Sequence, residues 1–131
     1  NKKLKDLASS STYPRRIEIL GGIYDQDKLN SLYANCLTYT HGHSVGGTNP
    51  SLLRAMGAGA PVLAYDCEFN REVTANQALY WKDANQYAEL LINGNFTTMG
   101  EVLRQRVADV YQWDLVTDQY EELAQRMAAR S

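Results

Sequence analysis

Apolar residues along the chain form short runs that alternate with longer segments of helical spacing. Runs that are apolar at every second position, or throughout, predict strands, and they lie at 15–20, 36–40, 61–65 and 78–81. The run at 61–65, PVLAY, is continuously apolar, which is typical of a strand buried on both faces. The first run ends at Gly21 and Gly22, a pair that predicts a turn.

The other segments place apolar residues three and four positions apart, the spacing of a helix that buries one face. Asp25 is a favoured N-cap residue, and Thr98 with Glu101 has the spacing of a capping box. Trp81, Trp113 and the tyrosines fall on apolar faces, so we expect them to be packing anchors rather than stacking platforms. We expect helices over 2–8, from Asp25 through Tyr33, over 50–56 and 83–92, from Thr98 through Val110, and from Val116 through Met127.

Strands that alternate with helices imply parallel β-α-β units. We therefore expect an α/β fold, a three-layer doubly wound (Rossmann-like) parallel sheet with helices on both faces. Ligands of such sheets bind outside the carboxyl ends of the strands. This rule brings three predicted loops together, at 21–24, 41–49 and 66–72.

Length and charge narrow the class of protein. A chain of 131 residues fits a single domain over 1–131, and a net charge of −2 lacks the basic excess of a nucleic-acid-binding module. No apolar run approaches the roughly 18 residues of a membrane span, and no signal peptide opens the chain. Cys36 and Cys67 lack a secreted-type spacing, which favours reduced thiols and a cytoplasmic location. Because the first residue is Asn1, we expect a fragment of a longer protein.

The loop at 41–49 begins the segment HGHSVGGTNPSLLRAMGAG, the most informative stretch of the chain. Asn49 is a strong N-cap residue and Pro50 is favoured at the first helical position, so a helix begins here. Gly46 and Gly47 let the main chain approach a ligand closely. A helix N-terminus behind flexible glycines predicts a phosphate or diphosphate site. The alternative is a tight turn followed by an ordinary helix cap.

Two familiar nucleotide motifs are missing from the sequence. It has no Walker lysine pattern and no G-x-G-x-x-G after the first predicted strand, so neither a P-loop nor an ordinary nicotinamide site is expected.

The pair His41 and His43 has a spacing that can bind a metal at the end of a strand. Zinc needs three or four ligands, and Asp66, Cys67 and Glu68 in the next loop are the further candidates. A metal-dependent hydrolase at His41 and His43 is thus an alternative. The preferred interpretation is that His43 and Ser44 form hydrogen bonds with a bound ligand or brace the loop.

The segments HGHSVGGTNPSLLRAMGAGAPVLAYD and FNREV resemble the donor-binding half of a bacterial GT-B glycosyltransferase of family 4, closest to its rhamnosyltransferase-like members. In that family a glycine-rich loop leads into a helix, a strand and a short loop ending in EV. The likeness covers about 17–73, and the segment 111–123 resembles the terminal helices of the family.

The resemblance implies a bound nucleoside-diphosphate sugar and names its contacts. Gly46, Gly47, Thr48 and Asn49 would hold the diphosphate, with His43 and Ser44 beside them. Arg71 and Glu72 would contact the sugar or a phosphate, and Tyr24 would lie near the base. The family is metal-independent, so we expect no cofactor.

The resemblance also implies the reaction, a retaining hexosyltransferase-type transfer to a polysaccharide or glycan precursor. The glycan or lipid-linked acceptor would bind an N-terminal domain that this chain lacks, together with the first strand of its own domain. We therefore expect the fragment alone to be inactive and assign no catalytic residue. The full-length protein would be cytoplasmic, or peripheral at the inner face of the membrane.

The chain departs from the family pattern at two positions. Many members carry glutamates where this sequence has Gly46 and Arg54. Arg54 either forms a salt bridge on the helix surface or reaches a phosphate or ribose. The missing carboxylates motivate a second hypothesis, a non-catalytic nucleotide- or phosphate-binding module.

Overall fold

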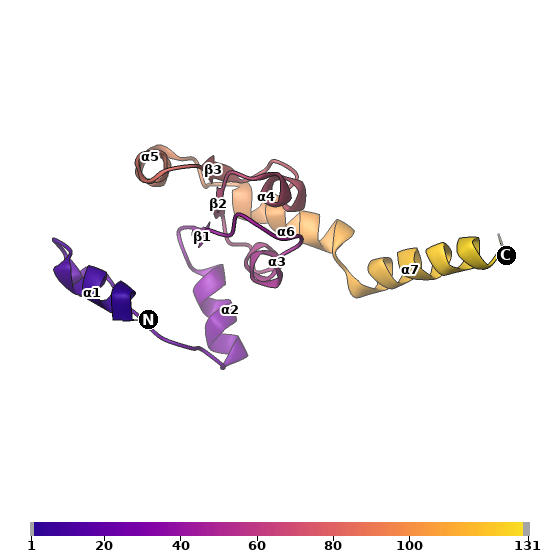
Figure 1. Cartoon of the computed structure of the whole chain (residues 1–131), viewed down its shortest axis with the longest axis horizontal. Helices are drawn as coiled ribbons and strands as arrows, with labels where there is room; N and C mark the ends of the chain where they lie inside the picture. Colours follow the sequence, from indigo (N-terminus) through magenta and orange to yellow (C-terminus); the bar gives the residue numbers. More distant parts are fainter. Residues whose placement is uncertain (1, 130–131) are drawn as a thin grey trace.

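A parallel sheet of three short strands lies at the centre of the fold (Figure 1). The computed structural model describes residues 2–129, and within them the strands are β1 (Tyr39–His41), β2 (Val62–Tyr65) and β3 (Leu79–Trp81). β2 lies between the other two and pairs with both in parallel. The predicted α/β class and the parallel sheet are confirmed, with three strands in place of the four expected.

Helices precede, separate and follow the strands, as the spacing of apolar residues predicts. At the start of α2 the Asp25 carboxylate accepts the backbone N–H of Lys28 at 3.1 Å, which confirms the predicted cap. Thr98 makes no side-chain cap bond, so the predicted capping box is wrong although its helix is present. The helices are α1 (Lys2–Ser10), the 3₁₀ helix η1 (Pro14–Arg16), α2 (Gln26–Ala34), α3 (Pro50–Gly57), α4 (Glu68–Val73), α5 (Ala84–Asn93), α6 (Met99–Val110) and α7 (Trp113–Ala128).

The main core lies between one face of the sheet and the helices α3, α4 and α6. Val62 and Ala64 alternate onto this face and are buried. They join a cluster with Leu52 and Met56 of α3 and Leu103 of α6. Burial of these apolar side chains is the main force that fixes α3, and hence the loop before it, against the sheet.

The other face of the sheet is covered by α5. Tyr87 of α5 packs edge-on against Trp81, with 5.5 Å between ring centroids, and its hydroxyl lies 3.0 Å from the Thr40 hydroxyl. The Trp81 indole N–H donates to the Leu63 carbonyl at 3.3 Å. Trp81 is therefore a packing residue, as the sequence predicts.

The first turn of α6 approaches the segment before β2 so closely that no side chain fits between them. A Cβ atom on Gly100 would lie 2.0 Å from the carbonyl oxygen of Gly59. Gly59 itself has a φ of +81°, which glycine adopts without steric cost. This contact sets how near α6 lies to β2.

The predicted strand at 15–20 does not form. Pro14 begins the short η1 helix, and the residues after it run without sheet pairing to α2. Ile17 and Ile19 are 48% and 42% exposed, so their alternation is not used to bury a face. Alternation gives only a propensity for strand, and a strand also needs a neighbour to pair with.

Two further boundaries differ from those predicted. The strand predicted at 36–40 begins at Tyr39, so the first three residues of the run lie outside it. The segment expected to be a loop at 66–72 is largely the helix α4. Val73 of this helix is buried in the core cluster, which stabilises a helix too short to form by propensity alone.

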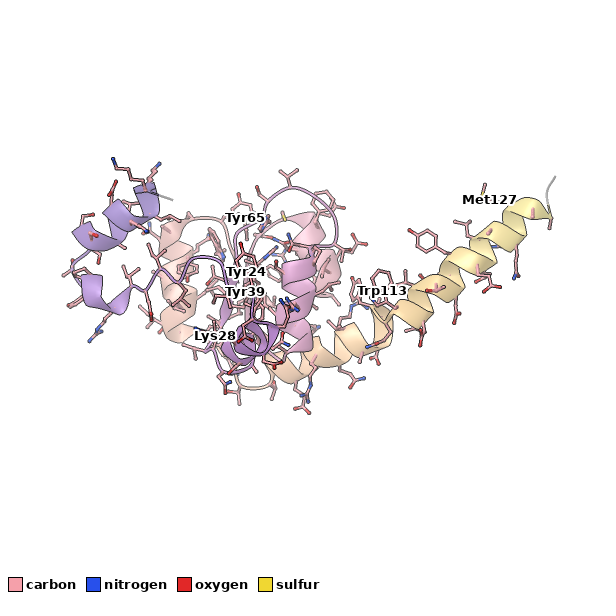
Figure 2. All side chains as sticks on the ribbon, turned by 90° about the horizontal axis from the view of Figure 1, so that it is seen from below. Tyr24, Lys28, Tyr39, Tyr65, Trp113 and Met127 are labelled. Carbon is pink, nitrogen blue, oxygen red and sulfur yellow. The ribbon has the colours of Figure 1, made fainter. Side chains whose placement is uncertain are left out.

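Figures 1 and 2 show α1 and α7 extending away from the body on opposite sides. Trp113 and Tyr120 of α7 are 83% and 71% exposed. The prediction that Trp113 is a packing anchor is therefore wrong within this structure. Among the described residues, no helix combines the length and apolar character that crossing a bilayer requires.

Replacing Gly100 by alanine tests the close contact between α6 and the segment before β2. The new methyl group would collide with the Gly59 main chain, so we expect Gly100→Ala to lower the free energy of unfolding by at least the roughly 1–3 kcal/mol that overpacking costs. Urea unfolding followed by circular dichroism measures the loss.

Gly57→Ala is the matched control. Its Cβ would meet Val107 at 3.7 Å, an ordinary contact, so its stability should stay within about 0.5 kcal/mol of the parent. Equal stability of the two variants would contradict the packing described.

Candidate functional site

A cavity of about 120 Å³ lies at the carboxyl end of β1, where the parallel-sheet rule places a ligand. Its walls come from the loop between β1 and α3 and from the region where α4 begins. The loop contributes most of the lining, and α4 closes the other side. The lining residues are His41, His43, Val45, Gly46, Gly47, Thr48, Asn49, Pro50, Cys67, Phe69 and Asn70.

The main-chain donors of the loop are available to a ligand. Within residues 2–129, the backbone N–H groups of Gly46, Gly47, Thr48 and Asn49 have no hydrogen-bond acceptor. Gly46 has a φ of +114°, a conformation open mainly to glycine. Successive free amides beside a cavity are suited to bind the oxygens of an anion.

The helix itself contributes less than the sequence suggests. The Asn49 carboxamide oxygen accepts the N–H groups of Ser51 and Leu52 at 2.9 and 3.4 Å, and Pro50 has no N–H. The N-cap prediction is thus confirmed, but the cap occupies donors that the prediction assigned to a phosphate. The donors that remain belong to the loop.

Asn70 of α4 holds this loop in place. Its side-chain NH₂ group donates to the His43 carbonyl at 2.9 Å and to the Tyr65 carbonyl at 2.8 Å, and the residue is only 4% exposed. The Cys67 thiol also lies 3.8 Å from the His43 carbonyl. The end of β2 and the loop after β1 are therefore joined through one buried amide.

His41 ends β1 and is 1% exposed at the base of the cavity, where it stacks on His43 with 4.9 Å between ring centroids. Its Nδ1 lies 3.3 Å from the hydroxyl of Tyr39. Burial, and secondarily the nearby His43, lower the pKa of His41, so its imidazole is neutral at pH 7. Burial, with Tyr33 as the lesser cause, raises the pKa of Tyr39 to about 12.

Arg71, predicted to reach the ligand, is directed elsewhere. Its guanidinium forms a salt bridge of 2.6 Å with Asp66, a hydrogen bond with Asn76, and stacks 4.1 Å over the Tyr80 ring. The hydrogen bond from Arg71 is the main cause that lowers the pKa of Asp66, with smaller help from Lys82. Arg71 therefore stabilises the region after β2 and does not line the cavity.

Four other predicted site residues also lie outside the cavity lining. Ser44 and Glu72 are exposed, and Tyr24 is 90% exposed. The exposed Arg54 guanidinium donates to the Gln26 side chain at the start of α2. The structure thus brings together His43, Gly46, Gly47, Thr48 and Asn49, but not Tyr24, Ser44, Arg54, Arg71 and Glu72.

Only some of the side chains proposed as metal ligands lie together. His41, His43 and Cys67 line the same cavity, whereas Asp66 is engaged by Arg71 and Lys82. Among residues 2–129, no group of three or more His, Cys, Asp or Glu side chains is placed to hold a metal ion.

Asn70, Phe69 and Val45 are lining residues that the sequence did not indicate. The sequence does not predict the burial of Asn70, because it predicts a loop over 66–72. Its spacing of three from Val73, on what is now a helix, is the signal that could have placed it on a buried face.

No protein-family model, curated protein or solved structure matches this chain.

Replacing Asn70 tests whether it braces the loop. Asn70→Ala would leave the His43 and Tyr65 carbonyls without this donor, and we expect a loss of about 1–3 kcal/mol in the free energy of unfolding. Urea unfolding followed by circular dichroism measures this loss.

Asn30→Ala, at an exposed position of α2, should change stability by no more than about 0.5 kcal/mol. A loss at Asn70 no greater than at Asn30 would show that the two hydrogen bonds do not brace the loop.

Proposed function

We propose that this chain is the donor-binding domain of a glycosyltransferase and holds the diphosphate of a nucleoside-diphosphate sugar at the end of β1. The observation that carries the proposal is the run of free backbone amides at Gly46–Asn49 beside the cavity. The family resemblance of the same segment supports it. The finer fold assignment, half of a GT-B fold with a doubly wound sheet, is part of this proposal.

The size of the cavity limits what enters it. A cavity of about 120 Å³ is well below the roughly 300–1,000 Å³ of pockets that enclose a whole ligand, so it suits a group of about phosphate size. The sugar and nucleoside would then lie over the exposed surface beside the loop. This arrangement fits a site in which the phosphate is anchored first and the rest of the donor is held by a second surface.

The charge of the site bears on catalysis. Transfer of a sugar leaves negative charge on the departing diphosphate, which preorganised donors and cations stabilise. Within residues 2–129 the cavity is lined by amides and histidines and by no lysine or arginine. The proposed transferase therefore needs positive charge from outside this lining.

The absence of lysine and arginine from the cavity lining, within residues 2–129, also favours a second candidate, a phosphate-binding module without turnover. The family glutamates are replaced by Gly46 and Arg54, and Arg54 is held by Gln26 instead of facing the cavity. Turnover of a sugar nucleotide by a longer protein that contains this chain would decide for the transferase. Such a transferase, acting on a lipid-linked acceptor, would work at the inner face of the membrane.

Calorimetric titration of the 131-residue chain with UDP, GDP and dTDP tests binding. We expect one of the three to bind, and Gly47→Val to weaken it by about tenfold or more, because the branched side chain obstructs the close approach of the phosphate to the loop amides. A Cβ atom at Gly47 meets nothing within 4 Å, so the variant should fold.

The control is Gly42→Val, on the same loop and equally open, but outside the cavity lining. Equal weakening by both valines, or binding that neither affects, would place the nucleotide elsewhere. Absence of binding to all three nucleotides would contradict a diphosphate site in this chain.

A further inference from the structure

The Nε2 atom of His41 is a buried polar atom without a hydrogen-bond partner among the described residues. The side chain is 1% exposed and is one of the residues that line the cavity. Leaving such an atom unpaired is unfavourable, and native proteins keep few of them. Because His41 is one of the residues that line the proposed phosphate cavity, its unpaired and buried Nε2 indicates a contact that forms when a ligand binds and the ring adjusts.

The neighbours of His41 determine which ring nitrogen carries the proton. The Tyr39 hydroxyl lies 3.3 Å from Nδ1, and no other hydrogen bond of this hydroxyl occurs within residues 2–129. If Nδ1 carried the proton, both the tyrosine proton and Nε2 would be left unpaired. If the tyrosine donates to Nδ1, only the Nε2–H group is unpaired. The second arrangement satisfies more polar groups and makes Nε2 a donor.

The rings around His41 keep this geometry fixed. His43 stacks on it with an interplanar angle of 23°, and Tyr39 is held edge-on by Tyr33 of α2 at 5.3 Å between centroids. A neutral imidazole carries one N–H group, so in this tautomer Nε2–H is the only side-chain donor of His41.

We propose that His41 binds the ligand directly, its imidazole donating from Nε2–H to a phosphate oxygen held by the amides of Gly46–Asn49, with Tyr39 as the positioning residue that fixes the tautomer. This rests on the proposed function, because the acceptor is the diphosphate of that site. It adds a side-chain donor to a set that otherwise consists of main-chain amides. In this proposal His43, the second residue of the H-x-H pair, has a structural role, because its ring stacks on that of His41.

Nitrogen-15 NMR of the histidine side chains, with inorganic pyrophosphate as the probe, tests this directly. The chain has two histidines, so a His43→Gln variant assigns the spectrum. We expect His41 in the Nε2–H form before titration, and its Nε2 resonance to shift as pyrophosphate binds. Nδ1–H as the main tautomer, or a His41 signal unmoved at saturation, would overturn the inference.

Two substitutions separate binding from folding. A glutamine amide can place its N–H near the position of Nε2, whereas an asparagine amide reaches only the position of Nδ1. We therefore expect His41→Asn to weaken pyrophosphate by about tenfold or more, and His41→Gln to retain most of the affinity. Equal loss in both variants, with unchanged melting temperatures, would contradict a donor at Nε2.

Tyr39→Phe removes only the hydroxyl and keeps the ring contacts. We expect it to give a mixture of His41 tautomers in the same spectrum, while an unchanged Nε2–H form would refute the role of Tyr39. If the chain binds no pyrophosphate, both the proposed function and this inference fail. If it binds pyrophosphate while His41 is unaffected, only this inference fails.

Discussion

The geometry of the site depends on one buried side chain, the carboxamide of Asn70. Its two hydrogen bonds join the carbonyl that ends β2 to the loop that follows β1. A glycine-rich loop held only by its ends would sample many conformations, and ordering it on a ligand would cost conformational entropy. Because Asn70 fixes the loop at His43, the amides that follow are partly arranged before any ligand arrives. The buried position of Asn70 follows in turn from Val73, which anchors α4 in the core.

The donors gathered at the cavity are neutral. Main-chain amides and the buried imidazole of His41 provide hydrogen bonds, while the nearby cations are used elsewhere, Arg71 by Asp66 and Arg54 by Gln26. Neutral donors orient an anion and bind it without a strong long-range field. The proposed transferase thus divides the work: this chain orients the diphosphate, and positive charge from outside the cavity completes the stabilisation of the leaving group.

The sequence predicts much of what local chemistry decides, although the Thr98 capping box does not form. Asp25 and Asn49 cap the helices expected of them, and the continuous apolar run at 61–65 is a buried strand. It failed where a distant partner decides. The alternation of Ile17 and Ile19 could not reveal whether a neighbouring strand exists. The resemblance implies a ligand contact for Arg71, whereas its salt bridge with Asp66 forms only when α4 folds against the end of β2. The sequence indicates His41 only as a possible metal ligand, because the burial of its Nε2 depends on the packing around it.

The most direct measurement of the central claim is a map of backbone amide resonances during titration of the isotope-labelled chain with UDP, GDP or dTDP, whichever binds. We expect the largest changes at the amides of Gly46, Gly47, Thr48 and Asn49, because these residues line the cavity and their N–H groups are free. Smaller changes should appear at Asn70. Saturable binding that leaves these four amides unchanged, with shifts confined to other parts of the chain, would contradict a diphosphate site at the end of β1.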